Sequence, residues 1–199
     1  MRLPCRFPGR TSSRTAGCAG SVVGVMNPLA GVRARAYLVD GVLYLGVAAL
    51  EVPLGLAAIR FGWSGNHAFV YAASTVAPVV AAVLAARAES GPHRATVGKR
   101  REHLKVVPAS TSPGDRDARI SFSRALVRNV IKITVPWQLG HTVALGASWG
   151  GFEERDPLTL ASTILVYPLL GAMVWLVLRA DGRALHDRAA GTRVVSTRN

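Results

Sequence analysis

Charged side chains are scarce in this 199-residue chain, and acids are the scarcest: 11 Asp and Glu stand against 24 Lys and Arg. Charged residues make up 18% of the sequence, whereas an ordinary soluble domain carries about 25%. Half of the residues are hydrophobic, which excludes disorder over most of the length. High hydrophobicity combined with a net charge of +13 is typical of a membrane protein with basic cytoplasmic loops. Nucleic-acid binders are the other basic class, but they rarely need long uncharged runs, so we expect no nucleic-acid partner.

Residues that would carry familiar chemistry are also missing. The two cysteines, Cys5 and Cys18, both lie in the N-terminal segment and form neither a disulfide framework nor a metal-ligand spacing. Gly98-Lys99 lacks the upstream Gly and the following Ser or Thr of a phosphate-binding loop. The GxSxG and HExxH motifs are absent. We therefore expect no enzyme, no cofactor and no metal site.

The N-terminal segment, residues 1–30, scatters Arg among Pro, Gly, Ser and Thr. It has no apolar core region of the kind a signal peptide needs, and it offers too little apolar surface to fold alone. We predict a disordered basic tail there, with Met26 as an alternative start.

Four apolar blocks follow, and each is close to the roughly 20 residues that a membrane-spanning helix requires. They predict an all-α membrane protein with four transmembrane helices at about 36–59, 66–86, 130–150 and 158–178. The second and fourth blocks carry no formal charge, and Pro157 suits the first position of the fourth helix. The third block contains Pro136, Gln138 and His141, so it either spans the membrane or lies in the interface.

The distribution of basic residues predicts the orientation of these helices. Six Arg lie in residues 1–35, nine Lys and Arg lie in residues 87–124, and five Arg follow the fourth block. The two short loops on the other side hold one Arg each, Arg60 and Arg155. By the positive-inside rule, the basic loop, the short C-terminal segment and both termini are cytoplasmic.

The first apolar block contains the main candidate for a functional site. Arg33, Asp40 and Glu51, with Tyr37 and Tyr44, fall along one face of the predicted helix. An ionisable residue inside a membrane is costly and is a functional hypothesis by default. The alternative is a structural anchor, in which Asp40 pairs with Arg33 and is sealed in the bundle. Glu51, near the outer end, could also be solvated.

The basic segments have alternative readings too. The loop around Lys99 either contacts anionic lipid headgroups or only fixes the topology. Arg124, Arg128 and Lys132 share one helix face and either snorkel to the interface or reach an acid such as Asp40. Residues 182–195 predict a short helix ended by Gly191 and then a β-prone run that could pair with residues 104–107.

Four segments in order resemble the RDD family of bacterial membrane proteins, named for one Arg and two Asp. These are RARAYLVD, TVGKR with LKVV, RALVRN, and GRALHDRAAGTRVV. The resemblance covers about residues 31–195 and matches Arg33, Asp40 and Asp187 to the family's Arg and two Asp. Arg101-Glu102-His103 departs from the family, whose members usually carry apolar residues and a Gly there. The resemblance implies one transmembrane domain, over residues 31–196, in a bacterial plasma membrane.

The family's activity is mostly unassigned, and some members resemble sodium/proton antiporters. One hypothesis is therefore a small-cation/proton exchanger in which Asp40 alternates between proton and cation, Arg33 sets its pKa, and Asp187 pairs with basic residues at the cytoplasmic mouth. Glu51 is a further candidate residue of this ion or proton site. Four helices leave little room for a complete path, so we expect a homo-oligomer. The alternative is a non-transporting structural or assembly partner, in which the same ionic residues only lock helices together.

Overall fold

The computed structural model describes residues 27–112, 118–179 and 181–198. Its helices are α1 (Ala30–Ala49), α2 (Val52–Arg60), α3 (His67–Ser90), α4 (Val97–Arg101), α5 (Phe122–Asn129), α6 (Val135–Ser148), α7 (Pro157–Leu178) and α8 (Leu185–Ala189). A 3₁₀ turn, η1 (Trp63–Gly65), precedes α3, and a π-helical turn, η2 (Val130–Thr134), joins α5 to α6. The strands are β1 (Leu104–Pro108) and β2 (Thr192–Ser196).

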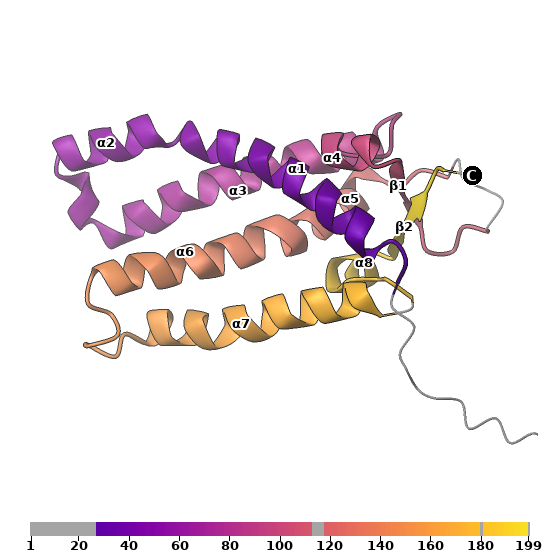
Figure 1. Ribbon diagram of the computed structural model, residues 1–199. Coiled ribbons are helices and arrows are strands. Elements are labelled where there is room, and N and C mark those ends of the chain that lie inside the picture. The colour runs from indigo at the N-terminus through magenta and orange to yellow at the C-terminus, as the bar shows by residue number, and fades with distance from the viewer. Residues whose placement is uncertain (1–26, 113–117, 180, 199) are drawn as a thin grey trace, which may run out of the picture.

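Long helical rods make up most of the molecule. They are α1 with α2, α3, the run from α5 through α6, and α7, and they lie side by side, while α4, α8 and both strands gather at one end (Figure 1). Three of the rods, Ala30–Arg60, His67–Ser90 and Pro157–Leu178, are long and apolar enough to cross a membrane. They contain the first, second and fourth expected spans. The third expected span corresponds to η2 and α6, which do not meet the same test among the described residues.

The outer faces of the rods are apolar. Leu38 on α1, Ile164 on α7 and Leu56 on α2 each expose more than 60% of their surface. A soluble monomer rarely exposes continuous apolar faces of this extent. These faces therefore suit a lipid environment.

Helix ends and breaks follow local chemistry. The side chain of Asn66 caps α3 by accepting from the backbone N–H of Phe69 at 3.1 Å, and Asp156 caps α7 by accepting from the N–H of Thr159 at 2.8 Å. Pro157 stands at the start of α7, as predicted. Pro78 lies inside α3 and removes one backbone donor there. The rod α1–α2 is interrupted at Leu50 and Glu51.

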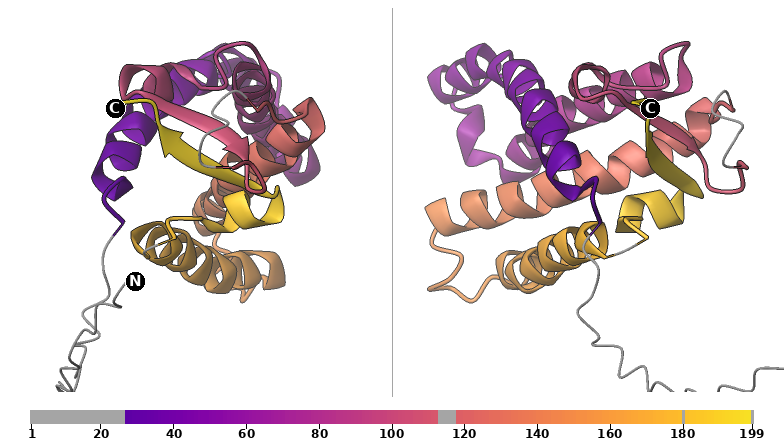
Figure 2. Two further views of the ribbon diagram at one scale, coloured as in Figure 1. Left: turned by 90° about the vertical axis from the view of Figure 1, so that its right-hand side faces the viewer. Right: turned by 45° about the vertical axis from the view of Figure 1, so that its right-hand side comes forward.

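The two strands form an antiparallel pair in which Leu104 lies opposite Ser196 and Pro108 opposite Thr192. Figure 2 shows this pair closing one end of the bundle. The predicted pairing of the C-terminal run with residues 104–107 is thereby confirmed. The predicted short helix is α8, which ends at Ala189, two residues before Gly191 in the left-handed region at φ 62°. Val106 packs with Ala86 and Ala125 in a small apolar core under the sheet.

The prediction of a disordered N-terminal tail falls mostly on residues 1–26. Cys5, Cys18 and the alternative start at Met26 lie outside the described residues. Asn27 is the first described residue, and its backbone N–H donates to the carbonyl of Leu178 at 3.0 Å. The described chain therefore enters α1 beside the end of α7.

Candidate functional site

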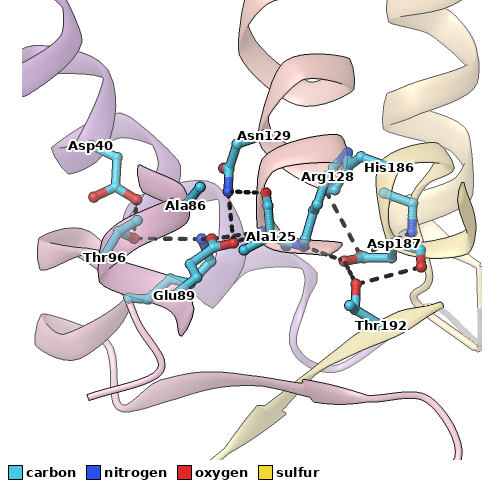
Figure 3. Close-up of polar contacts among 12 residues, drawn as sticks. Asp40, Ala86, Glu89, Thr96, Ala125, Arg128, Asn129, His186, Asp187 and Thr192 are labelled. Atoms are coloured by element: carbon cyan, nitrogen blue, oxygen red, sulfur yellow. Dashed lines mark hydrogen bonds and ion pairs between the residues drawn. The ribbon is translucent and has the colours of Figure 1, made fainter. Parts of the chain in front are cut away.

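Five charged side chains from five helices meet beneath the β-sheet and form what we call the ionic cluster. Figure 3 labels three of them, Glu89, Arg128 and Asp187. The cluster joins two acids to three cations, and the carboxylates of both acids are fully buried. Its members are Arg33 of α1, Glu89 of α3, Lys99 of α4, Arg128 of α5 and Asp187 of α8.

Glu89 is the centre of one half of the cluster. Nη1 of Arg128 donates to its two oxygens at 2.6 and 2.7 Å, and Nζ of Lys99 lies 2.5 Å from Oε1. Nδ2 of Asn129 donates to Oε2 at 2.8 Å. A buried charge is tolerated only when it is paired and hydrogen-bonded. Glu89 meets both conditions, so it ties α3 to α4 and α5.

Asp187 is the centre of the other half. Its Oδ2 accepts from Nη2 of Arg33 at 2.6 Å, and its Oδ1 accepts from Nε of Arg128 at 3.0 Å. Burial raises the pKa of Asp187, but the positive charges around it, led by Arg128, more than offset this and hold the pKa well below its usual range. Burial and the charge of Arg128 lower the pKa of the adjacent His186, which is therefore neutral at neutral pH.

Asp40 lies next to the cluster but has different partners. Its Oδ2 accepts from the hydroxyl of Thr96 at 2.5 Å, and its Oδ1 accepts from the backbone N–H of Gly98 at 2.8 Å. The close approach of α4 to α1 depends on Gly98, because a Cβ there would overlap the carbonyl oxygen of Ala36. Asp40 is only 1% exposed, and among the described residues no Lys or Arg forms an ion pair with it.

The predicted pairing of Arg33 with Asp40 is wrong. Along a single helix the two side chains share a face, but α8 brings Asp187 against Arg33 and supplies a closer partner. Snorkelling is also wrong for Arg128, which is 1% exposed and bonded to Glu89 and Asp187. Lys132 is buried too, and its Nζ lies 4.8 Å from the centre of the Tyr37 ring.

Several residues of the site escaped sequence reasoning. Glu89 lies three residues beyond the second apolar block, where it reads as part of a solvated loop, but α3 continues to Ser90 and carries it inside. Thr96 and Lys99 stand in a basic loop and showed no periodic pattern. One signal was available: Glu89 is the one acid within the basic stretch 87–106 besides Glu102.

A second set of polar groups lies inside the bundle, further from the sheet. Oε1 of Glu51 accepts from the backbone N–H of Ala77 at 2.5 Å, one residue before Pro78 in α3. The side chain of Gln138 bonds to the hydroxyls of Thr75 at 3.1 Å and Ser74 at 3.3 Å. These contacts connect the α1–α2 break, α3 and α6.

Tyr44 lies between Asp40 and Glu51 along the rod. Its hydroxyl is buried and has no hydrogen-bond partner among the described residues. Tyr44 also lines a small cavity with Ala77, Pro78 and Ile133. We call Asp40, Tyr44 and Glu51 the interior polar row. It extends over about 16 Å, since eleven residues rise about 1.5 Å each.

The candidate site residues thus separate into two groups. Arg33 and Asp187 belong to the ionic cluster, whereas Asp40 and Glu51 belong to the interior polar row. Within residues 27–112, 118–179 and 181–198, no three His, Cys, Asp or Glu side chains gather in a way that could hold a metal ion. The acids of the row could exchange single protons or small cations, and the cluster could hold helices together.

Apolar rods with lipid-suited faces and a buried charged cluster at one end define an integral membrane protein of helical type. The sequence profile of the RDD family matches residues 28–191. The chain therefore belongs to the RDD family, which confirms the resemblance seen in its motifs. No curated protein and no solved structure matches it.

Proposed function

We propose that this protein exchanges small cations for protons across a bacterial plasma membrane, with Asp40 and Glu51 as the exchanging carboxylates. Arg33 and Asp187, expected at the same site, instead support the helices around it. The proposal follows from a difference between the acids of the ionic cluster and those of the interior polar row, where Asp40 is buried and Glu51 is half-buried. Glu89 and Asp187 are each paired with two cations, whereas Asp40 and Glu51 form no ion pair with Lys or Arg in the described part of the chain.

That difference has a physical consequence. An ionised carboxylate in an apolar environment is strongly disfavoured unless a counter-charge reaches it. Neutral donors from Thr96, Gly98 and Ala77 supply hydrogen bonds but no charge. Acids without a fixed counter-charge can take up a small cation or a proton in turn, and that alternation is what an exchanger needs.

The rods also contain irregular helical segments near the interior polar row. The α1–α2 break falls at Glu51, Pro78 interrupts α3, and the π turn of η2 lies within the third rod. Irregular helices that line a polar interior are common at the binding sites of transporters, and π turns are frequent at functional sites.

The remaining parts of the proposal concern the setting. We propose that η2 and α6 form a fourth span, so that both termini, the basic loop and the β-sheet lie on the cytoplasmic side. The basic residues of that side favour this orientation and would contact anionic headgroups. We also propose a homo-oligomer, because the cavity that Tyr44 lines between the described rods is small. No enzymatic activity is proposed.

A second candidate function is favoured by the ionic cluster itself. The cluster connects α1, α3, α4, α5 and α8, and both of its acids are paired with cations. Such a network serves equally as a lock in a non-transporting assembly partner, because buried ion pairs can specify one arrangement of helices.

The deciding experiment measures proton flux driven by a sodium or potassium gradient in proteoliposomes. We expect flux with the native chain, and loss of most of it with Asp40→Asn or Glu51→Gln, while thermal unfolding in detergent confirms that both variants are folded. The matched control is Glu154→Gln, which removes an exposed acid and should leave flux unchanged.

Absence of flux from the native chain, together with lower thermal stability of Asp40→Asn, would refute transport by the isolated protein and support the assembly role. Flux that persists in both variants would place the exchanging group elsewhere.

A further inference from the structure

A polar pocket of about 180 Å³ opens on the surface beside α4, away from the ionic cluster. The turn at Pro92 and His93, the end of α4, the start of β1 and Thr197 after β2 form its walls. Ala95 and Leu104 are buried among the residues that line it. At about 30 Å³ per water molecule, the volume is enough for a phosphate group with a short substituent.

The lining of this basic pocket carries positive charge only. Arg100 and Lys105 contribute two permanent cations, and His93 and His103 contribute ring N–H donors. No lining residue is acidic. Glu102, the nearest acid along the chain, turns to Arg35 at 3.2 Å instead.

This lining contrasts with the ionic cluster. Lys99, adjacent to Arg100 in α4, is paired with Glu89 at 2.5 Å. Neither Arg100 nor Lys105 forms an ion pair within the described ranges of the chain. Two cations that line one pocket without an acid leave a charge that an anionic ligand would complement.

The backbone around the pocket is fixed in an unusual conformation. His103 has φ 54° and Arg94 has φ 52°, in the left-handed region that side chains seldom adopt. The carbonyl of His103 accepts from both the backbone N–H and the hydroxyl of Thr197, at 2.8 and 3.1 Å. The carbonyl of Arg94 accepts from the N–H of Val106 at 2.9 Å. Conformations of this kind persist where surrounding contacts hold them, often at binding sites.

We propose that the basic pocket binds the phosphate group of an anionic ligand, which is either a phospholipid headgroup or a soluble phosphate ester. The planar fork of Arg100 matches phosphate oxygens in a bidentate manner, and Lys105 adds a compact charge. Ring N–H groups of His93 and His103 add further donors, while the hydroxyl of Thr197 donates to the carbonyl of His103 and holds that turn in place. The site is independent of the exchange proposed for Asp40 and Glu51.

The experiment uses two probes with the same headgroup, glycerol 3-phosphate and dihexanoyl phosphatidic acid, titrated into the purified full chain in a non-ionic detergent. Dihexanoyl phosphatidylcholine serves as the zwitterionic comparison. We expect a phosphomonoester to bind, and the double variant Arg100→Gln with Lys105→Gln to weaken binding at least tenfold, which is about 1.4 kcal/mol. Arg101→Gln is the matched control, because Arg101 is exposed and does not line the pocket.

Binding of both probes would show that the phosphate group suffices, and binding of phosphatidic acid alone would identify a lipid as the source. Both results support the site, provided that Arg101→Gln binds within about twofold of the native chain and that sulfate competes. Binding of neither probe, or an equal loss with Arg101→Gln, would overturn the proposal and leave only diffuse surface charge.

Discussion

The contact between α4 and α1 gives a sharp prediction at Gly98. Replacing it with Ala places a Cβ over the carbonyl oxygen of Ala36 and 2.9 Å from Oδ1 of Asp40, whereas ordinary Cβ contacts begin at 3.4 Å. Helix α4 must withdraw from α1, since the Ala36 carbonyl is part of the α1 backbone. The withdrawal lengthens the hydrogen bonds that Asp40 accepts from Thr96 and Gly98.

The size of the effect follows from these two bonds. A hydrogen bond to a charged group contributes about 1.5–3 kcal/mol, and one lost bond with partial loss of the other amounts to about 3 kcal/mol. For a chain of this length, that corresponds to a fall in Tm of about 6–12 °C. The assay is thermal unfolding of the purified full chain in detergent, followed by circular dichroism.

Gly46→Ala is the matched control. Gly46 lies in α1, and a Cβ there meets nothing within 4 Å. It should be neutral or slightly stabilising, because Ala favours a helix over Gly by about 1 kcal/mol. If Gly98→Ala were as stable as Gly46→Ala, the packing of α4 on α1 would not be as described and Asp40 would not depend on it.

Three further predictions concern other contacts. Gly146→Ala should weaken the packing of α6 on α7 and lower Tm, because its Cβ would overlap the side chain of Thr159 in α7. Gly140→Ala on the same helix is the control: its Cβ meets nothing within 4 Å, so its Tm should equal that of the native chain. Glu89→Gln should lower the free energy of unfolding by about 3–5 kcal/mol, because it leaves buried cations without their partner; a denaturant titration showing under 1 kcal/mol would contradict the pairing. The low pKa of His186 means that folding disfavours its proton, so Tm should fall as pH drops through about 6.5, and His186→Gln should remove that part of the fall. The low pKa of Asp187 adds stability above about pH 4 that is lost on further acidification, and a flat Tm from pH 7 to pH 3 would contradict both assignments.

Much of the architecture was predictable because each signal was local. Uncharged runs gave α3 and α7, Pro157 marked a helix start, and Gly191 marked a helix end before a β-prone run. The strand pairing required only that two short runs of branched residues lie at the same end of the bundle.

The partners of the charged side chains were harder to predict from the sequence, because they depend on which helices pack against each other. Arg33 and Asp40 share a helix face, and helical spacing alone pairs them. Tertiary packing instead pairs Arg33 with Asp187, 154 residues further along the chain. It also pairs Arg128 with Glu89 and Asp187, two acids from different helices. Glu89 was missed because the limits of an apolar run do not reveal how far a helix continues.

The partnership of Arg33 with Asp187 also sets an order of events during synthesis. Helix α1 leaves the ribosome early, but the acid that neutralises its Arg33 is made 154 residues later. At about 5–20 residues per second, the cation waits roughly 8–30 s without that partner. The cluster therefore cannot be completed until α8 has been translated, so the helices inserted first remain unlocked until the last tenth of the chain is made.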